Sequence, residues 1–207
     1  MLAPVVFVVD DDISVRESLE LLIRSAGWDR ELFASAEEFL ARPRVSAPSC
    51  LILDVNLPDL NGLELQKRLA ADRNEMPIIF ITGFGDVPMT VKAMKAGAVE
   101  FLTKPFSDDV LLNAIRSAIE HSQAALGSEA DMRTLRDRYD SLTHREQQVM
   151  GFVVSGRLNK QIGGELGISE ITVKAHRGQA MRKMKANSLA DLVRMADGLH
   201  LASTLHV

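Results

Sequence analysis

The sequence predicts a doubly wound parallel α/β domain of five strands, followed by an all-α domain of four helices that contains a helix-turn-helix. Short apolar runs rich in β-branched residues alternate with helical patterns in the first half, and only helical patterns follow. Residues 1–125 hold 12 Lys and Arg against 19 Asp and Glu, a net charge of −7, whereas residues 126–207 hold 12 against 9, a net charge of +3. A basic C-terminal part indicates a nucleic-acid partner.

Five apolar runs are expected to form the sheet. They are residues 5–9, 31–33, 51–54, 78–82 and 100–102. Apolar residues follow one another in these runs without alternation, which is typical of parallel strands buried on both faces. We expect the strand order 2-1-3-4-5, one of the two common orders of doubly wound sheets.

Helical patterns separate these runs. They cover residues 14–27 with Gly27 as the C-cap, 35–41 with a capping box of Ser35 and Glu38, 61–71, 86–97 and 108–121. A polar stretch follows, and its apolar residues keep a helical rhythm. We therefore expect the first domain over residues 4–120 and a helical linker over 121–138, with Gly127 as a candidate break.

The last domain is expected over residues 139–204. Thr143 and Glu146 predict a helix start, as do Ser188 and Asp191. A helix over 159–166, a glycine turn over 167–169 and a second helix over about 170–186 have the order of a helix-turn-helix.

The composition also bears on the compartment. The apolar run near the N-terminus is too short to span a bilayer, and a signal-peptide pattern is missing. The single cysteine, Cys50, excludes an internal disulfide. We expect a cytoplasmic protein without a membrane partner.

Charged and hydroxyl side chains follow the predicted strands at one edge of the sheet. The first strand ends at Asp10 and Asp11, the third at Asp54, the fourth at Thr82, and the fifth is followed by Lys104. Ligands of doubly wound sheets bind outside the carboxyl ends of the strands. Converging carboxylates are stable around a hard cation, so the sequence predicts a Mg²⁺ site with the groups needed for phosphoryl transfer.

Four sequence motifs of the first domain resemble those of a known family. The motifs "VVDDD", "LDVNLPDLNG", "ITG" and "LTKPF" give segment 5–120 a resemblance to the receiver domain of bacterial response regulators. The resemblance implies that Asp54 accepts a phosphoryl group, with Lys104 and Thr82 assisting, and that the only chemistry is phosphoryl transfer and hydrolysis at Asp54. It implies Thr82 and Phe101 as switch residues and a cis peptide before Pro105.

The same resemblance implies a metal site and a role for each acid in the opening run. Mg²⁺ (or Mn²⁺) would be held by Asp10, Asp11, Asp54 and the backbone carbonyl of Asn56, with Asp10 acting mainly through water. Asp12 is then an outer or surface acid. The family commonly has a polar residue where this chain has Phe84, which either excludes water from the phosphoryl group or packs against the next helix.

The C-terminal helices resemble a LuxR-type helix-turn-helix, and the whole chain resembles the FixJ-type response regulators. The helical period puts Val173, Ala180 and Met184 on the core side of the second helix and Ile171 on the opposite side. Residues near the start of such a helix contact base edges, whereas Arg182, Lys183 and Lys185 are expected at the DNA backbone. The DNA-contacting residues that we expect are Lys160, Thr172, Lys174, Ala175, Arg177, Gly178, Arg182 and Lys185.

The resemblance implies a function and partners. A sensor histidine kinase would phosphorylate Asp54, and the chain would form a homodimer on phosphorylation and bind promoter DNA to regulate transcription. A different interpretation is a receiver-gated protein-interaction module that does not bind DNA. A third is a haloacid-dehalogenase-type phosphatase with Asp10 and Asp12 as its aspartate pair, which leaves Asp54 unexplained.

Overall fold

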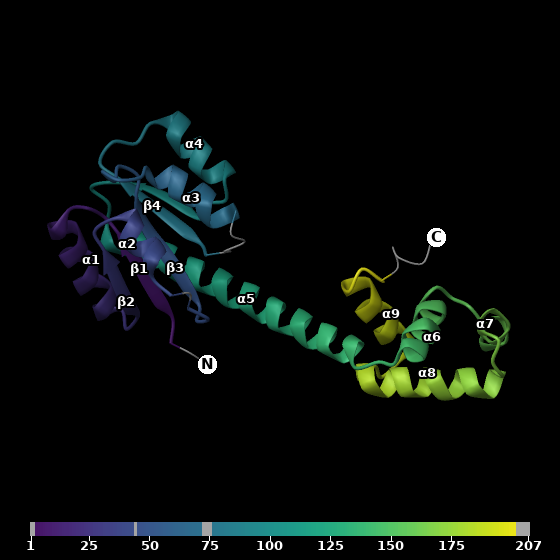
Figure 1. Cartoon of the computed structure of the whole chain (residues 1–207). Helices are drawn as coiled ribbons and strands as arrows, with labels where there is room; N and C mark the ends of the chain where they lie inside the picture. The colour runs from purple at the N-terminus through teal and green to yellow at the C-terminus, as the bar shows by residue number, and fades with distance from the viewer. Residues whose placement is uncertain (1–2, 44, 72–75, 202–207) are drawn as a thin grey trace. The chain divides into compact units, whose positions relative to one another are not determined.

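The computed structural model describes residues 3–43, 45–71 and 76–201. The chain divides into two compact units, Met1–Gly127 and Ser128–Val207, and each is described by itself below (Figure 1).

The first unit contains one parallel sheet. Its strands are β1 (Val5–Val9), β2 (Asp29–Phe33), β3 (Ser49–Asp54), β4 (Ile78–Thr82) and β5 (Glu100–Thr103), in the order β2-β1-β3-β4-β5. This confirms the predicted fold class and strand order. β2 begins two residues earlier than predicted, because Asp29 and Arg30 pair with Val5 and Val6 although they are polar.

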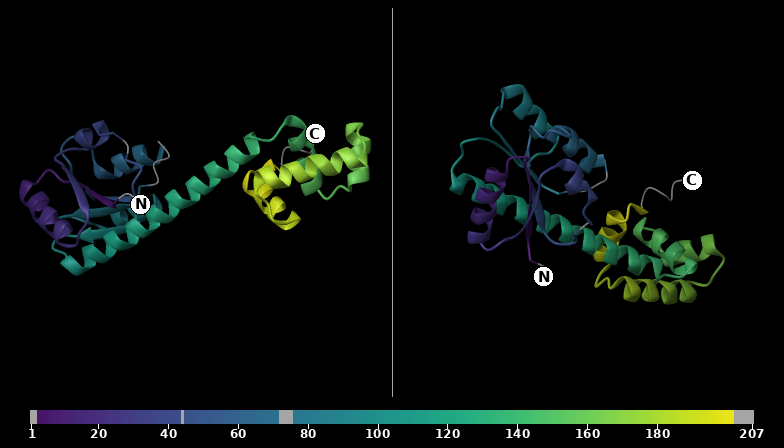
Figure 2. Two further views of the ribbon diagram at one scale, coloured as in Figure 1. Left: turned by 90° about the horizontal axis from the view of Figure 1, so that it is seen from below. Right: turned by 60° about the vertical axis from the view of Figure 1, so that its left-hand side comes forward.

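Helices cover both faces of the sheet. They are α1 (Ile13–Ser25), α2 (Ala36–Ala41), α3 (Gly62–Ala71), α4 (Val87–Lys95) and α5 (Asp108–Asp140). Val8 packs with Ile23 of α1 and Ile115 of α5 on one face, and on the other face Phe7 belongs to the cluster that contains Leu65 of α3. The three layers can be followed in Figure 2. Both faces of the central strands are therefore buried, as their continuous apolarity predicts.

Two local expectations need correction. α5 runs to Asp140 as one helix, so Gly127 does not break it, and residues 121–138 are helical as expected. At α2, Ser35 caps the helix by accepting a hydrogen bond from the Glu38 N–H at 3.1 Å. The Glu38 carboxylate, however, accepts from the Ala34 N–H, one residue before the cap, and so the reciprocal bond of a capping box is not made.

In the described residues, the second unit contains the C-terminal part of α5 and the helices that follow it. They are α6 (His144–Val154), α7 (Asn159–Leu166), α8 (Glu170–Met184) and α9 (Leu189–Gly198). Between α7 and α8, Gly167 takes the left-handed conformation with φ 65°, and Ser169 caps α8. This order of helix, glycine turn and capped helix confirms the helix-turn-helix. α8 ends two residues earlier than predicted, because Lys185 is left-handed with φ 57°.

The single cysteine lies in the core of the first unit. Cys50 lies in β3 with a fully buried side chain, and this burial raises the pKa of its thiol to about 12. Within the described ranges, none of the helices combines the length and the apolar character that a membrane crossing requires.

Candidate functional site

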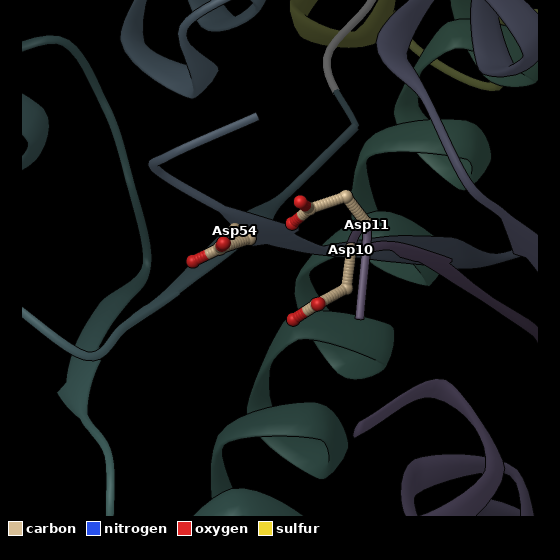
Figure 3. Close-up of side chains that lie close together, drawn as sticks. All are labelled: Asp10, Asp11 and Asp54. Atoms are coloured by element: carbon tan, nitrogen blue, oxygen red, sulfur yellow. The ribbon is translucent and has the colours of Figure 1, made fainter. Parts of the chain in front are cut away.

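Three carboxylates gather at the carboxyl edge of the sheet. Asp10 and Asp11 follow β1 and Asp54 ends β3, and one carboxylate oxygen of each lies within 4.8 Å of the others (Figure 3). Asp10 is fully buried, Asp54 is nearly so, and Asp11 is exposed. Adjacent parallel strands end at the same edge, so β1 and β3 bring together acids that are 44 positions apart in the sequence.

One cation partly balances these charges. Lys104 Nζ lies 2.8 Å from Asp10 Oδ2 and 3.8 Å from Asp54 Oδ1. The peptide between Lys104 and Pro105 is cis, as the resemblance implied. The pKa of Asp54 is raised chiefly by burial, and the neighbouring charges of Asp10 and Asp11 raise it further, against a lowering by Lys104. The cluster therefore keeps an excess of negative charge.

One carboxylate oxygen of the cluster lacks a hydrogen bond, and this indicates which kind of ligand the cluster can bind. Among the residues that the structure describes, Asp54 Oδ1 is buried and has no hydrogen-bond partner. A buried carboxylate oxygen without a donor is costly unless a cation or a proton meets it. Hard oxygen ligands that leave open positions are the donor set that suits Mg²⁺. The residues present therefore fit a divalent cation.

The Thr82 hydroxyl is held within its own loop. Thr82 is fully buried. Its Oγ1 accepts hydrogen bonds from the Phe84 N–H at 3.2 Å and from Asn56 Nδ2 at 3.3 Å, and it donates to the Phe84 carbonyl at 3.3 Å. The hydroxyl proton is thus directed to Phe84, so Thr82 has to exchange this bond before it can donate to a group on Asp54.

The two nearby aromatic residues have opposite environments. Phe101 is half-buried and lies against Phe80, with ring centroids 6.0 Å apart. Phe84 is 87% exposed. Of the two interpretations of Phe84, packing against the next helix is therefore wrong.

Asp12 serves the helix that follows it. Its Oδ1 accepts a hydrogen bond from the Ser14 N–H at 2.8 Å and so caps α1. Hydrogen bonds from the Ser14 hydroxyl and N–H lower the pKa of Asp12. The third acid of the run is accordingly a structural cap, and pairing it with Asp10 as a phosphatase motif finds no support.

The second candidate site is α8. Val173, Ala180 and Met184 are fully buried, as the helical period predicts. The opposite side is exposed and consists of Ile171, Lys174, Ala175, Gly178 and Arg182. Arg177 is half-buried on the flank.

Three residues of the expected DNA set already have partners within the unit. Arg182 Nη2 donates a hydrogen bond to Gln179 Oε1. Lys174 Nζ lies 3.7 Å from Glu170 Oε1, an exposed i,i+4 pair that holds the lysine only weakly. Thr172 is half-buried, and its Oγ1 is hydrogen-bonded to Ser169 Oγ at 2.8 Å. Lys160 in the first turn of α7 is exposed, as is Lys185, which lies beyond the end of α8.

Lys183 is the clearest error of the sequence interpretation. We expected it at the DNA backbone, but its Nζ donates to Glu146 Oε2 at 2.6 Å and to the Ser141 carbonyl at 3.2 Å. The motif Thr143-x-x-Glu146 indicated the start of α6, and the capping box is present. No local pattern indicates the second role of Glu146, because its partner lies 37 residues later.

Comparison with known proteins assigns each unit to a family model. Residues 6–116 match the response regulator receiver domain. Residues 140–196 match the bacterial regulatory proteins of the luxR family.

Relatives and solved structures extend this similarity to the full length. The chain is 49% identical to nodulation protein W of Bradyrhizobium diazoefficiens over 96% of this chain and 88% of that protein. It is 46% identical to the transcriptional regulatory protein FixJ of the same organism, over 92% of this chain and 93% of FixJ. The structure of response regulator StyR aligns with a TM-score of 0.85 at 48% identity, covering 95% of this chain and 99% of StyR.

Proposed function

This chain belongs to the response regulators that join a receiver domain to a LuxR-type DNA-binding domain, and from this premise we propose how its residues act. It is a DNA-binding regulator of transcription, and the match to the luxR family removes the support for an interaction module without DNA binding. A receiver domain implies a sensor kinase as the partner. The observation that carries the proposal is the convergence of Asp10, Asp11 and Asp54 beside Lys104.

We assign the cation to the carboxylate cluster. Asp10, Asp11, Asp54 and the backbone carbonyl of Asn56 would hold Mg²⁺ or Mn²⁺. When bound, the ion neutralises charge that develops on the phosphoryl oxygens. The Oδ1 of Asp54 supports this assignment, because within the described residues it accepts no hydrogen bond and its nearest cation, Lys104, is 3.8 Å away.

Asp54 is the proposed phosphoacceptor. One of its carboxylate oxygens attacks the phosphorus of a phosphohistidine on the sensor histidine kinase, a P–O bond forms, and the P–N bond breaks. Lys104, now 2.8 Å from Asp10, is close enough to pair with a phosphoryl oxygen on Asp54. Thr82 would donate its hydroxyl proton to the same group once it leaves the Phe84 carbonyl.

The proposed output is dimerisation. Movement of Thr82 would also move the loop to Phe84, because the Phe84 N–H donates to Thr82 Oγ1. Phe101, which packs on Phe80, could then change its position. α4 and β5 would then present a partner surface built from Val91, Lys92, Lys95 and Glu100. Sedimentation velocity tests this step. We expect a larger dimer fraction after phosphorylation, and an equal monomer fraction in both states would contradict it.

The dimer would bind promoter DNA through α8 and the start of α7, in the cytoplasm, where kinase and promoter are both accessible. One experiment tests both units, because it measures phosphorylation of the first and DNA binding by the second. Acetyl phosphate and Mg²⁺ should add one phosphoryl group by intact mass and raise the affinity for duplex DNA, with an affinity that falls steeply with salt. Asp54→Asn should remove both effects. Equal phosphoryl uptake by Asp54→Asn would refute the acceptor, and weak, salt-independent DNA binding would refute the output.

A further inference from the structure

Ile171 is an apolar residue that the second unit leaves in solvent. It is the second residue of α8, and its side chain is 80% exposed. In the described part of the chain, the apolar cluster of this unit does not include it. A single exposed apolar side chain is ordinary on a protein surface. Ile171, however, lies on α8, the helix that is proposed to enter the major groove, where an apolar side chain can contact a base.

Between Lys174 and Arg182, the side of α8 that carries Ile171 has only small residues. Ala175 and Gly178 follow Ile171 at spacings of four and seven residues, so all three share one face of α8. Both are exposed, and a Cβ built on Gly178 would meet none of the described atoms within 4 Å. Neither packing nor a left-handed backbone explains this glycine, which costs about 1 kcal/mol relative to alanine in a helix interior. The centre of the face therefore offers methyl groups and bare backbone.

The major groove offers one apolar partner for such a face. Thymine carries a C5-methyl group there, whereas the other base edges present hydrogen-bond donors and acceptors. Isoleucine in a helix has one strongly preferred χ1 rotamer, so contact with a base freezes little side-chain motion. The absence of a side chain at Gly178 lets the helix backbone approach the groove closely.

We propose that Ile171 determines specificity by contacting the C5-methyl group of a thymine in the operator, while Ala175 and Gly178 give α8 the room to approach. The proposal rests on the function proposed above, in which α8 enters the major groove. It adds a residue that is absent from the expected DNA-contacting set and assigns it a base. It also gives the unusual Gly178 a role that nothing inside the described unit supplies.

The test begins with selection of binding sites. Full-length protein, phosphorylated by acetyl phosphate and checked by intact mass, is used to enrich duplexes from a randomised pool. Each thymine of the enriched duplex is then replaced singly by deoxyuridine, which lacks only the C5-methyl group. We expect one position in each half-site where this replacement lowers the affinity about 4-fold, the effect of one buried methyl group.

Variants at position 171 assign the effect. Ile171→Ala should bind the thymine and deoxyuridine duplexes equally, Ile171→Val should keep most of the difference, and neither should alter the salt dependence, because no charge changes. Leu189→Ala is the matched control, since Leu189 is an exposed apolar residue of α9 and its loss should leave the thymine preference intact.

Each outcome decides between the two proposals. If no thymine is sensitive, or if Ile171→Ala keeps the full preference at the sensitive position, the role of Ile171 is overturned while DNA binding stands. If the wild-type phosphoprotein enriches no duplex, the proposed function fails and the role of Ile171 fails with it. Thermal unfolding of Ile171→Ala at the wild-type temperature would exclude a folding defect as the cause.

Discussion

Lys183 in the last turn of α8 donates a hydrogen bond to Glu146 in the first turn of α6, with Nζ and Oε2 2.6 Å apart. The same oxygen of Glu146 accepts from the Thr143 N–H at 2.7 Å. One buried carboxylate thus caps α6 and anchors the end of the helix that is expected to contact DNA. A half-buried lysine of α8 is therefore held by a buried carboxylate of α6.

Glu146→Gln should destabilise the second unit by about 1–2 kcal/mol at neutral pH, because a charge-assisted hydrogen bond is lost. Burial raises the pKa of Glu146, but the hydrogen bonds from Lys183 and Thr143 outweigh it, so the folded-state pKa lies below the usual 4.5. The stabilisation is therefore complete above pH 4.5 and is lost as the pH falls through the lower folded-state pKa.

The measurement is hydrogen exchange of the α6 and α8 amides in the wild-type protein and in Glu146→Gln, between neutral and acidic pH. The difference between them should shrink below pH 4.5. Glu64→Gln is the control, since Glu64 pairs with Lys67 on the exposed surface of α3, and it should change stability by less than about 0.5 kcal/mol. A pH-independent difference would contradict the role of the Glu146 charge.

Phe84→His should shorten the life of the aspartyl phosphate about 10-fold, because an imidazole can orient the attacking water by a hydrogen bond. Phe84 is exposed beside the Thr82 loop, so the exchange should not disturb the core. The decay of purified phosphoprotein is the readout. Phe84→Ala separates the two causes: equal acceleration by Ala and His would indicate shielding by the ring, and unchanged decay in both would remove Phe84 from the reaction.

Lys174→Ala should weaken binding to the selected operator by about 1–3 kcal/mol if its side chain pairs with a base. Lys185→Ala should lower affinity evenly across sequences and reduce the salt slope, because Lys185 lies beyond the end of α8. Titration of specific and random duplexes at several salt concentrations distinguishes them. Equal, sequence-independent losses for both variants would leave base contact by Lys174 without support.

Gly62→Ala should impair both folding and phosphorylation of the first unit. A Cβ at this position would lie 2.5 Å from the Asp54 carbonyl oxygen and 3.1 Å from the Val55 Cα, so the backbone that carries the acceptor has to move. We expect a loss of about 1–3 kcal/mol in urea denaturation and slower uptake from acetyl phosphate.

Gly127→Ala is the control for this substitution. A Cβ there meets no described atom within 4 Å, and the residue lies inside α5. It should stabilise the protein by about 0.5–1 kcal/mol and leave phosphoryl uptake unchanged. Normal uptake by Gly62→Ala would show that the Asp54 backbone tolerates the shift.

The fold could be predicted where burial leaves a continuous signal. β1 is apolar throughout, β3 and β4 are polar only at their ends, and the extents of all three were predicted to within two residues. β2 shows the limit, because its burial alternates and its first two residues are Asp29 and Arg30. The end of α8 was also misplaced, since its left-handed residue is Lys185 and glycine is the usual signal for that conformation.

Part of the candidate site could likewise be predicted from the sequence, and part could not. A rule about the edge of parallel sheets was enough to bring Asp10 and Asp54 together. Contacts made across the fold gave no local signal, which is why Lys183 was expected at DNA although it pairs with Glu146. Asp12 was expected as an outer acid, and only the backbone of α1 shows that it caps a helix.

The burial of Cys50 has a practical consequence. Thiol reagents attack an accessible thiolate, and this single cysteine of the chain is inside β3 with a pKa of about 12. The native protein should therefore be inert to maleimide dyes. A cysteine placed at an exposed position in each unit would be labelled selectively without replacing Cys50. Energy transfer between two such dyes would then turn phosphorylation into a distance that can be followed in real time.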